Sequence, residues 1–273
     1  MSDSNAAERS GAAPSAGVGS RRGADGGGAK QEAQLEMVHH LPEAKVVDRI
    51  EYVSGLARGK RVIHVGFVDA GYEDMQAATG TWLHEHLAAV ASSIVGIDVD
   101  EAGVERAKAR GYEAYVADGR QPDVLASLGI EPAELLIAGE VIEHLDDPGS
   151  FLDGLHGLLA PGGTLVLTTP NASGLLNGFA AMAGAEINHP DHVVLFSWRT
   201  LTNLLARHGW EHLRTATYVP AVKQAKGQGL SGRVLGLAGR FVLFLERSIG
   251  RGWAPFVADG LIVESRSAPD RLP

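Results

Sequence analysis

The chain contains no cysteine among its 273 residues, which excludes disulfide bonds, thiolate metal ligands and a cysteine nucleophile. It also has no apolar stretch of about 20 residues, the length that a helix needs to cross a bilayer. Basic residues are outnumbered, with 24 Lys and Arg against 33 Asp and Glu. The resulting formal net charge of −9 argues against a broad nucleic-acid-binding surface, because such a surface would repel phosphates.

Residues 1–33 have almost no large apolar side chains and are rich in Ser, Ala and Gly. Such a segment cannot bury enough surface to offset the entropy that it loses on ordering. We therefore expect a disordered tail over residues 1–33, one domain over 34–265 and a flexible tail over 266–273. No apolar stretch of a secretory signal is present in 1–33, and this, with the absence of cysteine, favours a cytoplasmic protein.

Strand-like and helix-like segments alternate from Val46 onward, which favours an α/β fold with helices on both faces of a mostly parallel sheet. Seven strands are expected, at residues 61–65, 93–97, 113–117, 134–138, 164–168, 211–218 and 260–264. Helices are expected at residues 42–56, from 81 onward, and at 102–109, 150–159, 198–208 and 230–247. Two apolar insertions, 173–187 and 221–256, are predicted to form lids over a substrate site.

Two strand ends carry the pattern of a nucleotide-binding unit. The first strand ends at Gly66, and the second ends at Asp98, 32 residues later. A glycine lets the backbone approach a ligand closely, and a carboxylate at the next strand end can accept hydrogen bonds from ribose hydroxyls. Asp118 follows the third strand and offers an acceptor for an adenine amine, while Glu140 follows the fourth. These positions predict a cofactor of the adenosine type.

Two longer motifs identify a family. The sequence EVIEHLDDP at residues 140–148 is followed by LLAPGGTLVLTTPN at 158–171, and HVVLFS occupies 192–197. With these motifs, residues 42–265 resemble the class I S-adenosylmethionine-dependent methyltransferases, close to the group that includes the ubiquinone-biosynthesis O-methyltransferases. The resemblance implies a Rossmann-like sheet of seven strands, in which the last strand, 260–264, is inserted antiparallel between 164–168 and 211–218.

The resemblance also implies S-adenosylmethionine as the cofactor and gives roles to the strand-end residues. Gly66 would admit the methionine end, Asp98 would bind the ribose hydroxyls, and Asp118 would accept from the adenine amine. Glu140 would lie along the cofactor.

The glycine loop departs from the family pattern of an acid followed by G-x-G-x-G. Here His64 stands in place of the acid, and Gly66 alone remains of the three glycines. The loop is also longer than is usual for the family. We expect Asp69 and His84 to take over contacts to the amino-acid part of the cofactor.

Methyl transfer to oxygen benefits from a general base, for which histidine has a suitable pKa. The candidates are His144, His189 and His192, with Asp191 able to orient a neighbour. The His-x-x-His spacing of His189 and His192 is also compatible with metal binding, but the sequence offers no obvious third ligand, so no metal site is predicted.

Segment 230–247 is apolar over most of its circumference as a helix, and Arg233, Arg240 and Arg247 recur every seven residues along one stripe. It is either a lid packed on the sheet or a contact with a membrane surface or a second copy of the chain. The sequence thus predicts methyl transfer to a small molecule, with a hydroxyl oxygen as the expected acceptor. The alternatives are a membrane-associated lipid or quinone methyltransferase and a non-catalytic cofactor-binding homologue. The sequence determines neither the acceptor, including oxygen against nitrogen or carbon, nor the oligomeric state.

Overall fold

The computed structural model describes residues 38–68, 80–182, 184–219, 244–245 and 248–268. The chain divides into a first unit, Met1–His40, and a second unit, Leu41–Pro273, which contains every strand and helix described below. The predicted tail 1–33, Asp69 and all but two residues of the predicted helix 230–247 lie outside the described residues. No helix within the described ranges combines the length and the hydropathy that a membrane crossing requires.

Eight strands form one sheet in the order β1-β7-β8-β6-β5-β2-β3-β4. Their bounds are Val46–Val47 (β1), Arg61–Val65 (β2), Ser93–Asp98 (β3), Glu113–Val116 (β4), Ala133–Gly139 (β5), Leu159–Pro170 (β6), Trp210–Tyr218 (β7) and Gly260–Ser267 (β8). β8 pairs antiparallel with both β6 and β7, and the other pairs are parallel. The predicted antiparallel insertion of the last strand is confirmed.

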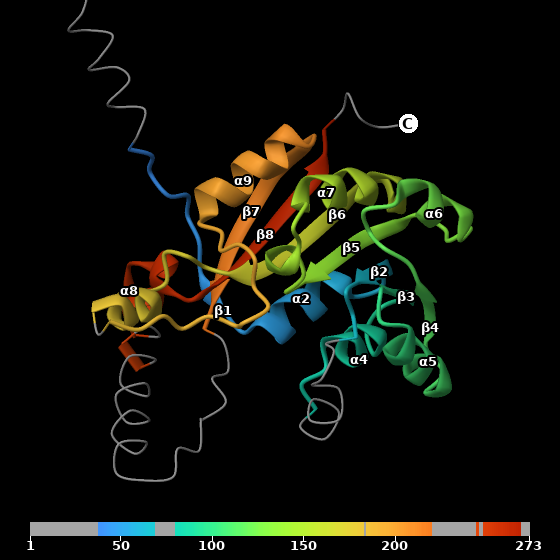
Figure 1. Cartoon of the computed structure of the whole chain (residues 1–273), viewed down its shortest axis with the longest axis horizontal. Helices are drawn as coiled ribbons and strands as arrows, with labels where there is room; N and C mark the ends of the chain where they lie inside the picture. Colours follow the sequence, from blue (N-terminus) through green and yellow to red (C-terminus); the bar gives the residue numbers. More distant parts are fainter. Residues whose placement is uncertain (1–37, 69–79, 183, 220–243, 246–247, 269–273) are drawn as a thin grey trace, which may run out of the picture. The chain divides into compact units, whose positions relative to one another are not determined.

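Helices cover both faces of the sheet, as Figure 1 shows. One face packs against α2 (Arg49–Ala57), α4 (Leu83–Ala88) and α5 (Glu101–Ala109), and the other against α6 (Pro122–Ser127), α7 (Pro148–Leu155) and α9 (Trp198–Arg207). The two faces have separate cores because successive side chains along a strand point to opposite faces of the sheet. In β2, Val62 packs with Leu83 and Leu87 of α4, whereas the next residue, Ile63, packs with Phe151 of α7.

The expectation of seven strands was wrong by one, because the first predicted helix begins later than expected. Val46 and Val47 pair with Thr217 and Tyr218 as the edge strand β1, as suits their β-branched side chains. Asp48 then caps α2, its carboxylate accepting a hydrogen bond from the Glu51 amide at 2.9 Å. The acidic cap, rather than the proline at residue 42, sets where the helix starts.

Other boundaries shift for similar local reasons. Asp147 caps α7, which therefore begins at Pro148, and the helix ends at Leu155 rather than at residue 159. The short helix α6 was not predicted. β8 continues to Ser267, so the first two residues of the predicted tail 266–273 belong to the sheet. Within the first predicted insertion, α8 spans Leu175–Met182.

The carboxyl ends of β2, β3, β4 and β5 lie at one edge of the sheet. β2 pairs with β3 on one side and with β5 on the other, so the chain reverses its winding direction between β2 and β5. Open α/β sheets bind ligands at such a reversal, outside the carboxyl ends of the strands. Four residues predicted to bind the cofactor lie at this edge: Gly66, Asp98, Asp118 and Glu140.

Candidate functional site

The turn after β2 is built on Gly66. Its φ of +69° is a left-handed conformation that glycine adopts without steric cost, and its amide donates to the Ile97 carbonyl of β3 at 2.8 Å. A Cβ added to Gly66 would overlap Cγ2 of Val141, in the loop after β5. Both the conformation and the space therefore require glycine where the ends of β2 and β5 meet.

Two apolar residues follow Gly66, and the second, Val68, stands where the family pattern has its next glycine. Phe67 and Val68 are buried, and two glycines make room for them. A Cβ on Gly96 of β3 would lie 2.7 Å from the Phe67 ring, and one on Gly103 of α5 would overlap Val68. The start of the altered loop is thus anchored in the core by side-chain packing.

Asp98 ends β3 with its carboxylate turned toward the same loop. One oxygen accepts from the Val68 amide at 2.9 Å and the other from the Asp100 amide at 3.0 Å. Burial raises the pKa of Asp98, and these amide hydrogen bonds oppose that rise. The Val99 amide also donates to this carboxylate, which has about four lone-pair sites, so part of its acceptor capacity is left for a ligand hydroxyl.

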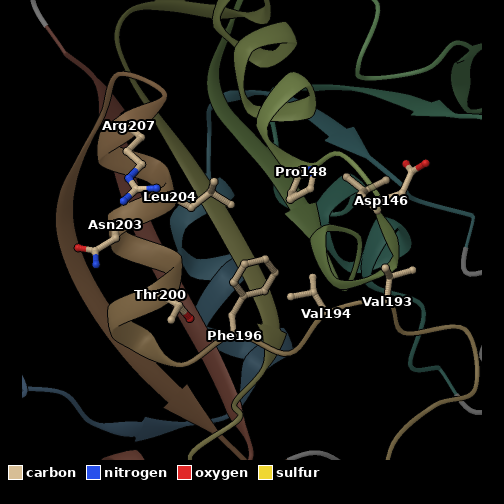
Figure 2. Close-up of a pocket in the computed structure, with 10 residues that line it drawn as sticks. Asp146, Pro148, Val193, Val194, Phe196, Thr200, Asn203, Leu204 and Arg207 are labelled. Atoms are coloured by element: carbon tan, nitrogen blue, oxygen red, sulfur yellow. The ribbon is translucent and has the colours of Figure 1, made fainter.

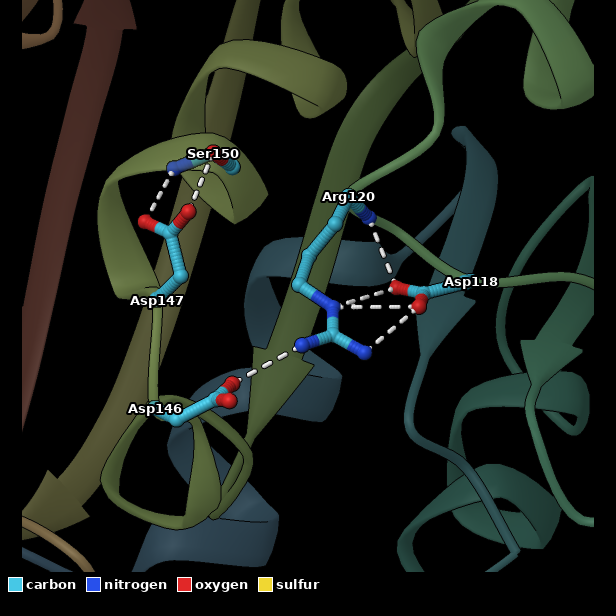
Figure 3. A network of polar contacts seen from close by, with 5 residues as sticks. All are labelled: Asp118, Arg120, Asp146, Asp147 and Ser150. Atoms are coloured by element: carbon cyan, nitrogen blue, oxygen red, sulfur yellow. Dashed lines mark hydrogen bonds and ion pairs between the residues drawn. The ribbon is translucent and has the colours of Figure 1, made fainter.

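Asp118 belongs to an ion-pair network at the end of β4, drawn in Figure 3. Arg120 donates to both of its oxygens, at 2.8 and 3.0 Å, and reaches Asp146 at 2.8 Å. The Arg120 guanidinium holds the pKa of Asp118 below its ordinary value. Asp118 thus remains an ionised acceptor, and the sequence analysis had missed its partner Arg120.

Glu140 follows β5 and lies at the centre of a second network. Its Oε1 accepts from the Thr168 hydroxyl at 2.9 Å and from the Tyr218 hydroxyl at 2.5 Å. Nη1 of Arg49 lies 3.5 Å from the same oxygen and donates to the Thr168 hydroxyl at 3.2 Å. Burial, together with the charge of Glu140, raises the pKa of Tyr218 well above its ordinary value, so the phenol remains a donor.

Glu143 is completely buried three residues further on, in the short helix η1 (Ile142–His144). Its Oε2 accepts from the Thr169 hydroxyl at 2.8 Å, and its Oε1 has no hydrogen-bond partner among the described residues. Burial, and then the nearby charge of Glu140, raise the pKa of Glu143 to about 8. At neutral pH this side chain is therefore mainly a neutral acid.

The three histidines predicted as candidate bases lie together beside Glu143. Ring centroids are 4.7 Å apart for His144 and His192, and 5.4 Å apart for His189 and His192. The Glu143 carbonyl accepts from the amides that follow His192, which ties the histidine loop to the end of β5. Burial and the neighbouring rings lower the pKa of His192, so this imidazole is neutral at pH 7.

Glu143 also supplies a third possible metal ligand, which was not obvious from the His-x-x-His spacing alone. One of its oxygens and one ring nitrogen each of His144 and His192 lie within 4.8 Å of one another, a grouping that can hold a metal ion. Glu143 could not be recognised as a ligand from the sequence, because its approach to His192 depends on the fold. The predicted absence of a metal site remains a prediction.

His84, predicted to contact the cofactor, is completely buried against His64. Their Nδ1 atoms are 3.3 Å apart, so one ring donates to the other. Burial lowers the pKa of His84 to about 4 and that of His64 well below its ordinary value. His84 thus pairs with the residue that replaces the acid of the family motif, and its contact with the cofactor remains a prediction.

A cavity of about 440 Å³ lies beside the strand ends, between α9 and the segment that leads into α7 (Figure 2). Arg207 and Asn203 of α9 stand at one side, and Asp146 stands at the other. Phe196 and other apolar residues form its wall. None of the predicted cofactor-binding residues lines this cavity, so we assign the site to the strand ends and not to the cavity.

Arg49, Thr168 and Tyr218, which hold Glu140, were absent from the sequence-based site. They come from α2, β6 and β7, and the Tyr218–Glu140 contact joins residues 78 positions apart. No short motif encodes such a contact. The only local signal was the position of Thr168 and Tyr218 at the ends of predicted strands.

A family model described as a methyltransferase domain matches residues 37–215. Among solved structures, a Bacillus halodurans protein assigned to the methyltransferases has a TM-score of 0.50 and 12% identity, covering 81% of this chain and 99% of that one. At this identity the likeness concerns the fold alone.

Curated relatives match shorter stretches. The ubiquinone biosynthesis O-methyltransferase of Pseudomonas aeruginosa is 30% identical over 159 residues, which are 57% of this chain and 62% of that protein. Its namesake from Caulobacter vibrioides is 33% identical over 111 residues, 39% and 43% of the two chains. A Mycolicibacterium smegmatis protein named for S-adenosylmethionine-dependent methyl transfer is 31% identical over 145 residues, 52% and 53% of the two chains. The chain spans about half the length of the curated relatives it matches.

Proposed function

The chain belongs to the methyltransferase domain family, and from that premise we propose that it transfers the methyl group of S-adenosylmethionine to a hydroxyl oxygen of a small molecule. Family membership establishes the reaction class and the cofactor, and the choice of oxygen is the proposal. The observation that carries it is the convergence of three histidines beside the end of β5, the strand that pairs with β2, which the Gly66 turn follows.

The strand-end residues fit the cofactor. Gly66 adds no side chain of its own to the turn after β2, and the Asp98 carboxylate at the neighbouring strand end can accept from the ribose hydroxyls. Asp118 supplies an ionised acceptor for the adenine amine. Bound S-adenosylmethionine supplies an electrophilic methyl group on a positively charged sulfur.

The chain must then align the acceptor and remove the proton from its hydroxyl. Nδ1 of His192 lies 2.6 Å from the side-chain oxygen of Asn188, and Nδ1 of His144 lies 3.2 Å from the Asp191 carbonyl. These contacts place the ring protons on Nδ1 and leave both Nε2 atoms as proton acceptors. Either Nε2 would accept the proton of the acceptor hydroxyl during methyl transfer.

Two further observations support an oxygen atom of a small molecule. The Pseudomonas and Caulobacter relatives are named as O-methyltransferases. The net charge of −9 disfavours a nucleic acid as the acceptor. The predicted membrane or oligomer contact through 230–247 stays a prediction, because nearly all of that segment lies outside the described residues.

Turnover tests the proposal directly. Release of S-adenosylhomocysteine would be measured with phenols, alcohols and amines of matched size, for the wild type, for His144→Ala and His192→Ala together, and for His86→Ala as a control. We expect phenols or alcohols to react, the double variant to lose about 10²–10⁴-fold in kcat while still binding the cofactor, and the control to be unchanged.

Preference for amines, or full turnover without both rings, would refute the oxygen acceptor with histidine as base. Cofactor binding without turnover on any acceptor would favour the non-catalytic alternative.

A further inference from the structure

Glu140 has the backbone of a residue held under strain. Among the described residues it is the one non-glycine with positive φ, at +57°. A side chain with a Cβ rarely adopts this left-handed conformation, because the Cβ comes too close to the following carbonyl oxygen. Such strain persists where the surroundings fix it, and it is concentrated at ligand-binding positions. The direction of the Glu140 side chain is therefore imposed by its neighbours.

The neighbours bind only one of its two oxygens. Thr168, Tyr218 and Arg49 all converge on Oε1, at 2.9, 2.5 and 3.5 Å. Oε2 takes part in no hydrogen bond or ion pair with the described residues, and the side chain is 31% exposed. The carboxylate is thus clamped through Oε1, with Oε2 left open to a donor from outside the protein.

The open oxygen belongs to the same sheet edge as the cofactor turn. Glu140 follows β5, which pairs with β2, and the next residue, Val141, packs against Gly66. Other acids of this edge are less suited to a cationic group. Glu143 is mainly neutral, and Asp98 accepts from the Asp100 amide of its own loop and from the Val68 amide of the turn after β2. His64, in place of the family acid, is a buried neutral ring paired with His84.

We propose that Oε2 of Glu140 accepts a hydrogen bond from the α-ammonium group of S-adenosylmethionine. The assignment rests on the proposed function, because it requires this cofactor in the site. In the family pattern the acid of the first long strand, β2, is replaced here by His64. The proposal therefore places recognition of the amino-acid end of the cofactor at the end of β5 instead. It also explains why three side chains from three elements hold one oxygen and leave the other open.

Calorimetric titration with two ligands tests this role. The ligands are S-adenosylhomocysteine and its deamino analogue, in which hydrogen replaces the ammonium group. They would be titrated into the full-length wild type, Glu140→Gln, and Glu134→Gln as a control on the same strand at its opposite end. Thermal unfolding of each ligand-free variant would confirm that it is folded.

A hydrogen bond between charged groups is worth roughly 1.5–3 kcal/mol. Glu140→Gln should therefore raise the Kd for S-adenosylhomocysteine about 10- to 100-fold. The deamino analogue should bind wild type and Glu140→Gln within about twofold of each other, since the lost interaction is already missing. Glu134→Gln should bind both ligands like the wild type.

If Glu140→Gln raised the Kd of both ligands equally, the proposal would be overturned, because the residue would then shape the site without binding the ammonium group. Unchanged affinity for S-adenosylhomocysteine would overturn it as well. A wild type that binds neither ligand would contradict the proposed function itself, and this inference with it.

Discussion

The two halves of the sheet edge hold their polar groups in different ways. In the half formed by β2, β3 and β4, Asp98 is fixed by backbone amides two residues after it and in the neighbouring turn. In the half formed by β5, β6, β7 and β8, Glu140 and Glu143 are fixed by side chains of Thr168, Thr169 and Tyr218 from other strands.

Histidines show the same contrast. His64 and His84, in the first half, form a buried neutral pair against the Phe67 ring. His144 and His192, in the second half, are partly exposed beside a buried acid. Groups held by the backbone suit the cofactor, whose chemistry is fixed. A network of side chains can change by substitution to suit a different methyl acceptor. The comparison therefore predicts which substitutions disturb the cofactor half and which disturb the other half.

The largest effect on stability is expected for Gly66→Ala. The change forces a Cβ into a left-handed backbone, at roughly 1–2 kcal/mol, and against Val141, at about 1–3 kcal/mol more. Gly59→Ala is a matched control, because Gly59 has the same φ of +69° with no atom near its Cβ position. Urea unfolding should show the control losing only the first amount. Equal losses in the two variants would mean that the contact between Gly66 and Val141 is unimportant.

The buried histidine pair predicts acid sensitivity of the first half. The pKa of His84 falls from about 6.5 in the unfolded chain to about 4 in the folded one. Between these values the unfolded state binds more protons, so stability falls as the pH drops from about 6.5 to 4, by on the order of 3 kcal/mol for this ring.

His84→Phe should flatten this part of the stability profile, while His86→Gln, on the same helix, should keep it. Urea midpoints measured from pH 4 to 7 would decide the matter. A profile as steep in His84→Phe as in the wild type would contradict the neutral buried pair.

Tyr218→Phe probes the side-chain network of the second half. The variant loses a buried hydrogen bond to a carboxylate, which should lower the free energy of unfolding by roughly 1.5–3 kcal/mol. Tyr115→Phe removes the same kind of bond, to Glu113, at an exposed position of β4, and should cost less. If chemical denaturation gives equal losses for the two variants, the Glu140 network contributes no more than a surface contact.

The smallest effect is expected for Arg120→Ala. Its ion pairs with Asp118 and Asp146 are partly exposed, and such pairs contribute little to stability and are screened by salt. Thermal unfolding at low and high salt should show a small difference that shrinks as salt is added. A loss of several kcal/mol would place this network among the main supports of the fold.

The same contrast explains how far the sequence predicted the site. Gly66, Asp98, Asp118 and Glu140 follow strands whose apolar runs and order are visible in the sequence, so their common edge follows from the α/β pattern. The cluster of His144, His189 and His192 was also foreseen as a set of candidates, though not its geometry.

What was missed depends on contacts between distant residues. Tyr218 reaches Glu140 from β7, with its ring packed over Gly260 of β8, where a side chain would overlap it. Glu143 meets His192 because its carbonyl anchors the histidine loop. The edge strand Val46–Val47 was missed for the same reason, since two residues form a strand only beside a partner. Hydrophobic periodicity in the sequence predicts helices and strands, whereas these features depend on how the helices and strands pack together.

The central claim is that the first half binds S-adenosylmethionine through Asp98. Calorimetric titration of S-adenosylhomocysteine into the wild type, Asp98→Asn and Asp100→Asn tests it most directly, since Asp100 is a neighbouring acid of the same turn. An amide keeps one acceptor oxygen where the carboxylate has two, so Asp98→Asn should raise the Kd at least about tenfold. Asp100→Asn should leave the Kd close to that of the wild type. Equal affinity in all three proteins would contradict the account.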